Sequence, residues 1–207
     1  MTTLRTLLTT VALLGVTEGT AAAQPVSYIT TARFTSGAPG CNQLVALSSA
    51  TCSNAGFSLL FMGATGLNIG NGSVVSLGTF FLTGSGTQVV PPGVVTFELF
   101  INQTMPSIGN GTFAGSISGT VTTGPDGNFS SLIWAPNSVR GIGVVTYTLI
   151  FDNIGPAAGR GLGIPINNER GINALVTTNV VPEPGTTALF AAGGLLLLAY
   201  ALRKKAV

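Results

Sequence analysis

VVTFELFIN, residues 94–102, alternates apolar and polar side chains with a period of two. An α-helix would not sustain this period, whereas a β-strand places successive side chains on opposite faces. Thr96, Glu98 and Asn102 would share the wet face, and the opposite face would carry Val95, Phe97, Leu99 and Ile101. The stretch therefore predicts an amphipathic β-strand with one face on a core.

The same alternation continues after this strand. Residues 112–122 place Ser and Thr on one face and Phe113, Ile117 and Val121 on the other, and Gly115 and Gly119 leave room there for a bulky neighbour. Residues 124–128, GPDGN, predict a hairpin tip leading to a strand at 129–134. Residues 142–152 alternate again, with the inward positions at Val145, Tyr147, Leu149 and Phe151.

The rest of the region between the termini also consists of short apolar runs separated by turn residues. Further strands are predicted at 26–35, 56–63, 73–83, 162–166 and 172–178, with Pro91-Pro92-Gly93 as a break and residues 153–170 as a loop holding at most one edge strand. No helix is predicted before the carboxyl terminus. We expect an all-β fold, an antiparallel β-sandwich, with a jelly roll as one form of it.

The first 23 residues have the three parts of a secretory signal peptide. Arg5 provides the positive charge, residues 7–16 the apolar segment, and Ala21 and Ala23 the small residues that signal peptidase reads. Cleavage after Ala23 would leave Gln24 as the first residue of a secreted domain at 24–181. This segment predicts export and signal peptidase as a processing partner.

The carboxyl terminus predicts a membrane-spanning helix. Residues 185–202 are almost wholly apolar, and Arg203, Lys204 and Lys205 follow them. A helix of this length measures about 27 Å, close to the roughly 30 Å hydrocarbon core of a bilayer. Because basic residues favour the cytoplasmic side, we expect an inner-membrane precursor whose domain faces the periplasm.

Charge excludes one class of partner. The 24–181 region contains no lysine, and its four arginines are balanced by four carboxylates, Glu98, Asp126, Asp152 and Glu169. Binding to nucleic-acid phosphates needs clustered Lys or Arg, so we expect no nucleic-acid partner.

The residue types also argue against catalysis. The chain has no histidine, which excludes Ser-His-Asp and Cys-His arrangements and leaves a metal site short of ligands. The four carboxylates could supply a glycosidase-type pair, but Glu98 is on a wet strand face, Asp126 is in a turn and Glu169 neighbours Arg170. We expect no catalytic residue, metal or cofactor. Cys41 and Cys52, separated by ten residues in an exported chain, predict one local disulfide.

Pro182-Glu183-Pro184 stands directly before the apolar stretch. With the basic end of the chain and the signal peptide, this arrangement resembles the PEP-CTERM sorting signal of exported bacterial proteins over residues 182–207, except that Gly185 stands where Ser or Thr is more common. The resemblance implies that exosortase, a membrane-embedded cysteine protease, recognises Pro182, Glu183 and Pro184 and removes the helix, in Gram-negative bacteria that make extracellular polysaccharide. The prolines keep the motif extended and outside the helix.

Three hypotheses for the domain follow. The leading one is a non-enzymatic component of the cell surface or extracellular matrix, associated with exopolysaccharide, biofilm or floc. The second is a carbohydrate-binding module in which Trp134 stacks on a sugar, although its place after Leu132-Ile133 and before Pro136 favours a core or strand-end position. The third is a fibre-forming subunit, suggested by low charge and strand edges without protecting lysines.

Overall fold

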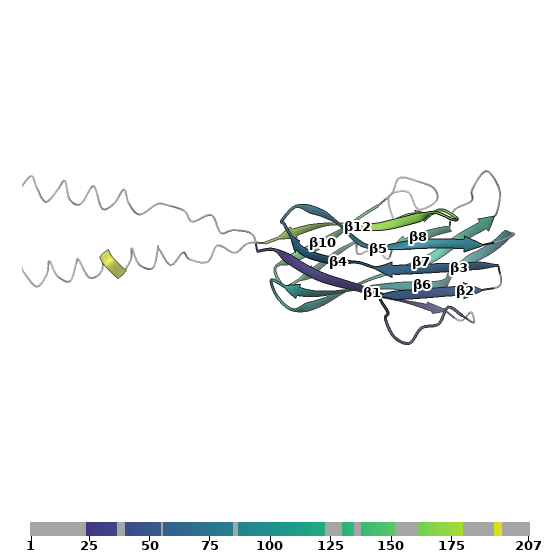
Figure 1. Cartoon of the computed structure of the whole chain (residues 1–207), viewed down its shortest axis with the longest axis horizontal. Helices are drawn as coiled ribbons and strands as arrows, with labels where there is room; N and C mark the ends of the chain where they lie inside the picture. The colour runs from purple at the N-terminus through teal and green to yellow at the C-terminus, as the bar shows by residue number, and fades with distance from the viewer. Residues whose placement is uncertain are drawn as a thin grey trace, which may run out of the picture. The chain divides into compact units, whose positions relative to one another are not determined.

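The computed structural model describes residues 24–36, 40–54, 56–84, 87–122, 130–134, 138–151, 161–179 and 193–195. The predicted signal peptide, hairpin tip and Pro-Glu-Pro motif lie outside these residues. All strands found in the described ranges belong to one compact unit, Ala23–Asn179 (Figure 1).

The strands form two sheets, and every strand pair is antiparallel. The first, sheet A, has the order β11 (Gly161–Ile164), β8 (Ser130–Trp134), β7 (Gly109–Thr122), β6 (Thr87–Met105), β1 (Val26–Ser36) and β4 (Thr65–Ile69). The second, sheet B, has the order β2 (Ser49–Asn54), β3 (Phe57–Gly63), β5 (Ser73–Gly84), β12 (Glu169–Thr178), β10 (Val145–Ile150) and β9 (Val139–Ile142).

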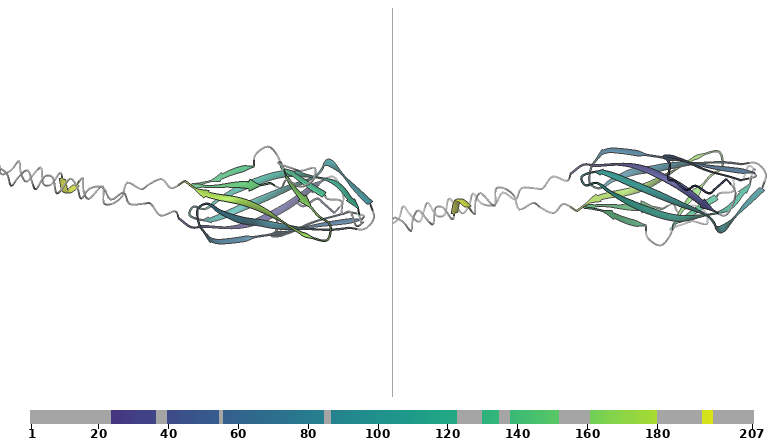
Figure 2. Two further views of the ribbon diagram at one scale, coloured as in Figure 1. Left: turned by 90° about the horizontal axis from the view of Figure 1, so that it is seen from above. Right: turned by 90° about the horizontal axis from the view of Figure 1, so that it is seen from below.

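The two sheets lie as layers on either side of one core (Figure 2). The predicted all-β antiparallel architecture is confirmed. The strand order differs from that of an eight-stranded jelly roll, because each sheet has six described strands and β6, β7 and β8 follow one another as a meander within sheet A.

Strand β6 contains the VVTFELFIN stretch and lies between β1 and β7. The predicted inward residues are all buried, namely Val95, Phe97, Leu99 and Ile101. Pro91-Pro92-Gly93 does not end the strand, so the predicted break there is wrong. Residues 91–94 instead stand opposite the single residue Ser118, and β1 pairs with β6 only from Val95 onward. The prolines are tolerated because few ladder hydrogen bonds are required of them at this position.

Three strands were not predicted from the sequence: β2, β4 and β9. The predicted strand at 142–152 is wrong at its start, because Gly143, with φ of 60°, turns the chain between β9 and β10. The inward positions Val145, Tyr147 and Leu149 are nevertheless buried as predicted. Strand β11 lies at the edge of sheet A, which agrees with the single edge strand allowed in 153–170.

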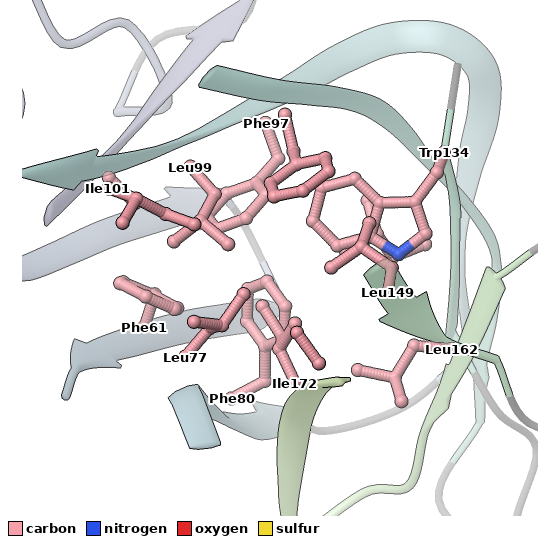
Figure 3. Packing of buried hydrophobic residues seen from close by; sticks show 14 of the residues in the cluster. Phe61, Leu77, Phe80, Phe97, Leu99, Ile101, Trp134, Leu149, Leu162 and Ile172 are labelled. Atoms are coloured by element: carbon pink, nitrogen blue, oxygen red, sulfur yellow. The ribbon is translucent and has the colours of Figure 1, made fainter. Parts of the chain in front are cut away.

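Aromatic rings from both sheets meet in the core. Phe97 of sheet A lies 4.8 Å from Phe80 and 5.2 Å from Phe61, both of sheet B, measured between ring centroids. Figure 3 shows these rings with aliphatic residues from both layers, including Leu77, Leu99 and Ile172. Burying each such side chain contributes about 1.5–3 kcal/mol, so this cluster is what holds the two layers together.

The chain passes from one sheet to the other at Ala64, between β3 and β4. The buried Thr30 of β1 stabilises this corner, because its hydroxyl oxygen accepts a hydrogen bond from the Ala64 amide at 2.7 Å and lies 2.8 Å from the Leu77 carbonyl, to which it donates. A Cβ on Gly63 would lie 2.2 Å from the Thr30 carbonyl oxygen. The corner therefore needs glycine at position 63.

Candidate functional site

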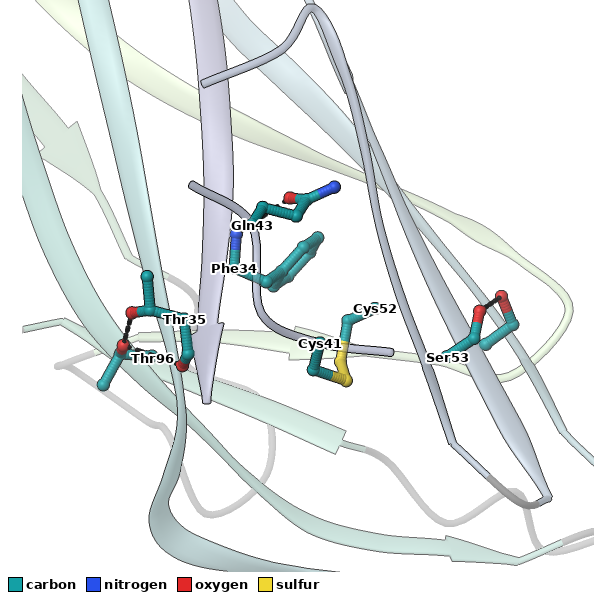
Figure 4. The surroundings of a disulfide bond; sticks show 8 residues. Phe34, Thr35, Cys41, Gln43, Cys52, Ser53 and Thr96 are labelled. Atoms are coloured by element: carbon teal, nitrogen blue, oxygen red, sulfur yellow. Dashed lines mark hydrogen bonds between the residues drawn. A yellow bond between two sulfur atoms is a disulfide. The ribbon is translucent and has the colours of Figure 1, made fainter. Parts of the chain in front are cut away.

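The predicted disulfide joins Cys41 and Cys52, and both residues are fully buried (Figure 4). It connects the start of the loop after β1 to strand β2 of the other sheet. The loop in turn pairs with β1. The Gln43 amide donates to the Phe34 carbonyl at 2.8 Å, and the Phe34 amide donates to the Gln43 side chain at 3.0 Å. The disulfide thus holds a segment that covers the edge of β1.

A buried polar network lies between the β6–β7 and β9–β10 turns. The Tyr147 hydroxyl donates to the Gln103 side-chain oxygen at 3.0 Å, and the Gln103 side-chain nitrogen donates to the carbonyls of Ser107 at 2.9 Å and Ile142 at 3.4 Å. Every polar atom of the Gln103 amide is therefore used in tying the turns together, and none points to a ligand.

Two tyrosines meet edge to face in the same region. The ring of Tyr28 lies 5.9 Å from that of Tyr147, and the Tyr28 hydroxyl donates to the Ser76 carbonyl at 2.7 Å. Burial raises the pKa of Tyr28 to about 12. Burial, and secondarily the charge that Tyr28 would carry, raises the pKa of Tyr147 well above its usual range. Both phenols are therefore neutral structural groups at physiological pH.

The outer face of sheet A carries hydroxyl and amide side chains on three neighbouring strands. We call this surface the hydroxyl face; its residues are Thr31, Thr35, Thr96, Asn102, Asn110, Thr112 and Ser116. They align in rows across the sheet. Thr35 of β1 pairs with Thr96 of β6, which pairs with Ser116 of β7, and the Thr96 hydroxyl donates to the Thr35 carbonyl at 3.0 Å. Part of this face, Thr96 and Asn102, was predicted as the wet side of VVTFELFIN.

Arg33, Glu98 and Phe100 lie together within the hydroxyl face. The Arg33 guanidinium donates to the Glu98 carboxylate and lies 5.5 Å from the centre of the Phe100 ring. The two opposite charges neutralise each other, so this part of the face is polar without net charge. Sequence reasoning placed Glu98 on a solvated face but missed its partner, because Arg33 is 65 positions away in the chain.

Trp134 lies at the end of β8 and is only 7% exposed. Its ring packs edge to face with Phe97 and Phe113, and a Cβ on Gly115 would lie 3.2 Å from it. Gly115 thus leaves room for β8, since the same Cβ would lie 2.9 Å from both the Ile133 carbonyl oxygen and the Leu132 side chain. A ring buried in this way has no exposed face on which a sugar could stack. Trp134 is therefore a core residue, and the hypothesis that it stacks on a sugar is wrong.

The remaining candidates lie apart from one another or outside the described residues. Glu169 is exposed at the start of β12, whereas Asp126 and Asp152 belong to undescribed segments. Within the described part of the chain, no three His, Cys, Asp or Glu side chains gather as a metal site would require. Of the predicted signal peptidase site, Ala21 and Ala23 lie outside the described residues. Gln24 is described and is exposed.

The predicted spanning helix, 185–202, is described only at residues 193–195, which are helical. Over the residues that the structure covers, no helix has the length and apolar character needed to cross a bilayer. The Pro182-Glu183-Pro184 motif also lies outside them, so its role remains a prediction from the sequence.

Comparison with known proteins gives one match. The family model of the PEP-CTERM protein-sorting motif matches residues 180–205. No curated protein and no solved structure matches the chain. The motif implies export, passage through the membrane and processing by exosortase. The resemblance inferred from Pro182-Glu183-Pro184 is confirmed, because residues 180–205 match the PEP-CTERM protein-sorting motif.

Proposed function

We propose that this protein is a non-enzymatic component of the cell surface or extracellular matrix, exported and then released from the membrane through its PEP-CTERM motif. The observation that carries the proposal is the sorting motif at residues 180–205. In support, the buried polar groups of Gln103, Tyr28 and Tyr147 are hydrogen-bonded within the domain itself.

The proposed route has two processing steps. Signal peptidase cuts after Ala23, and residues 185–202 then anchor the precursor in the inner membrane with the domain in the periplasm. Exosortase next acts at Pro182-Glu183-Pro184 and separates the domain from the helix. The domain that moves to the surface retains the disulfide, which suits an oxidising compartment.

We place the contact with extracellular polysaccharide on the hydroxyl face. Threonine, serine and asparagine side chains can donate and accept hydrogen bonds with sugar hydroxyls, and the partly exposed Phe100 adds an aromatic ring among them. The Arg33–Glu98 pair leaves the face without net charge, which favours a neutral polymer over a strongly acidic one. This assignment replaces the one that relied on Trp134.

The intact mass of the protein recovered from the surface of the producing cells tests the route. We expect a species that begins at Gln24 and lacks Thr186–Val207. Surface-exposed protein that retains residues 186–207 would contradict processing and would indicate a permanent single-span anchor.

A pull-down with the cells' own purified polysaccharide tests the binding surface. We expect the processed protein to bind and Phe100→Ala to bind more weakly. Leu175→Ala is the matched control, because it shortens a partly exposed apolar side chain on the outer face of sheet B. Absence of binding by the wild-type protein would remove the polysaccharide role, and equal losses in the two variants would remove its assignment to the hydroxyl face.

A further inference from the structure

Four exposed apolar side chains surround the end of the domain at which the described chain begins and ends. We call them the apolar rim: Leu67, Met105, Ile108 and Val144. Ile108 is 90% exposed and Leu67 is 70% exposed. Figure 1 shows β1 starting and β12 finishing at this same end. Exposed apolar residues scattered singly are ordinary, but four at one end of a domain indicate an interaction surface.

Pairing between strands places all four residues at this end. Met105 pairs with Ser27, one residue after the start of β1, and the amide beside Leu67, that of Asn68, donates to the Ser27 hydroxyl at 3.3 Å. On the other sheet, the amide of Asn179 donates to the Val144 carbonyl at 2.8 Å.

Ile108 belongs to the same group. A Cβ on Gly143 would lie 2.2 Å from the Ser107 hydroxyl, so the turn that carries Ile108 touches the turn that carries Val144. The rim residues therefore come from three separate turns or edges that converge where the chain leaves the domain.

This end carries no charged side chain among its described residues. Ranges 24–27, 66–74, 103–110, 142–146 and 176–179 contain no Asp, Glu, Lys or Arg. Glu169 and Arg170 begin β12, and the paired Arg33 and Glu98 lie six and seven residues along their strands from the Ser27–Met105 pair. The described charge nearest to this end is Arg140, two residues before Ile142, whose guanidinium donates to the Thr112 carbonyl. This end thus combines four exposed apolar side chains with neighbouring residues that carry no charge. Both features lower the desolvation free energy of entering a lipid headgroup layer.

The length of the chain after the domain sets how far this end can be from a membrane. Five residues, 180–184, separate Asn179 from the predicted helix at 185–202. Fully extended, five residues span at most about 18 Å. The headgroup layer itself extends roughly 6 Å beyond the hydrocarbon core. The apolar rim is therefore confined close to lipid for as long as the helix stays attached.

We propose that the apolar rim inserts into the headgroup layer of the bilayer while the precursor is anchored. This inference rests on the membrane anchoring by residues 185–202 proposed above. Because the short tether makes the contact intramolecular, the low affinity of a few apolar side chains for lipid suffices to maintain it. The contact holds Pro182-Glu183-Pro184 at the membrane surface, where a membrane-embedded protease can reach it, and cleavage then removes the tether and frees the domain.

A second copy of the chain fits this end less well than lipid. The chain leaves the domain at Asn179, directly beside Val144 of the rim. A copy packed on the rim would enclose the departing chain of both molecules and keep it from reaching the membrane within five residues. Lipid can surround the departing chain without this conflict.

The test uses the full chain reconstituted in vesicles of phosphatidylethanolamine and phosphatidylglycerol, with an environment-sensitive fluorophore on Ile108→Cys. Thr96→Cys is the control, because Thr96 pairs with Thr35, nine residues along β1 from Val26 and roughly 30 Å from the rim at 3.3 Å per residue. We expect a blue-shifted emission at position 108 that is quenched by lipids carrying a nitroxide near the headgroup, and neither effect at position 96.

Further variants and outcomes separate the explanations. Leu67→Ser, Met105→Gln and Val144→Ser together should abolish most of the quenching at position 108, while far-ultraviolet circular dichroism stays unchanged. If the wild-type chain does not float with the vesicles, the anchor fails and this inference falls with it. If the chain floats but position 108 is quenched no more than position 96, the inference alone is overturned. Blue-shifted emission without lipid quenching would show that protein covers the rim, and would also overturn it.

Discussion

Gly78 shows how a single residue constrains the packing of this domain. Its φ is +140°, which side-chain-bearing residues rarely adopt, and it lies where the pairing of β5 with β12 shifts register. A Cβ at this position would lie 2.4 Å from the Phe61 ring. The backbone must therefore come close to an aromatic ring of the core, which glycine alone permits.

We predict that Gly78→Ala lowers the free energy of unfolding by about 2–4 kcal/mol, because backbone strain and overpacking add. Gly141→Ala is the control, since nothing lies within 4 Å of its added Cβ and its φ is not positive. Urea unfolding followed by tryptophan fluorescence measures both. Equal stabilities of the two variants would contradict the close approach at Phe61.

The buried phenols predict how stability depends on alkaline pH. Below pH 10 the tyrosines are neutral in both the folded and the unfolded chain, so they contribute no pH dependence. Above pH 10 the unfolded chain loses its protons first, because the folded pKa of Tyr28 is about 12 and that of Tyr147 is also raised. The unfolded state then binds fewer protons, and stability falls as pH rises.

Urea unfolding between pH 7 and pH 11.5 should therefore show constant stability up to about pH 10 and then a decline of up to about 1.4 kcal/mol per pH unit for each phenol. Tyr28→Phe should make this decline shallower. At neutral pH the same variant should cost about 1 kcal/mol, because the Ser76 carbonyl loses its donor. Stability that stays constant to pH 11.5 in the wild type would exclude the burial of both phenols.

At the scale of elements, the disulfide loop completes the edge of sheet A. Strand β4 pairs with β1 only as far as Ile29. Beyond it, the edge of β1 is covered by Leu47, which exchanges backbone hydrogen bonds with Ala32 at 2.8 Å, and by Gln43 at Phe34. The loop from Cys41 thus takes the place of a neighbouring strand, and its attachment to β2 keeps it there.

We predict that Cys41→Ala with Cys52→Ala lowers the free energy of unfolding by about 2–3 kcal/mol, the loop-closure value for a loop of this length. Dithiothreitol should have a similar effect on the wild type and none on the double variant, which serves as its control. Guanidinium unfolding measures both. An effect of dithiothreitol on the double variant would show that the reagent acts elsewhere.

How far the elements could be predicted depends on their contacts. Strand β6 was predicted because its alternation of Phe97, Glu98 and Leu99 is strong within nine residues. Strands β2, β4 and β9 were missed because their small or mixed residues, such as Ser49–Asn54, gain their strand conformation from neighbours far along the chain. The exposure of Ile108 was only weakly indicated by the sequence, since the one sign of it is an apolar residue between the turn residues Ser107 and Gly109.

At the scale of the whole molecule, sorting should depend on the short motif and not on the domain. We predict that replacing Pro182, Glu183 and Pro184 together by alanine leaves the precursor unprocessed in the membrane fraction. Gly185→Ser, which restores the more common residue after the motif, should be processed at least as well as the wild type. Immunoblots of membrane and medium fractions compare the three proteins. Processing of the triple variant would contradict recognition of this motif.

The sequence by itself determined the all-β fold, the disulfide and the sorting motif. Each of these depends on residues close together in the chain. They are the period of two in VVTFELFIN, two cysteines separated by ten residues, and a Pro-Glu-Pro motif next to an apolar stretch with a basic end. Only the tertiary structure decided that Trp134 lies in the core, that Arg33 pairs with Glu98, and that Leu67, Met105, Ile108 and Val144 gather around the chain ends. The physical reason is distance along the chain. These arrangements depend on strand order and register, which bring together residues that no local pattern connects.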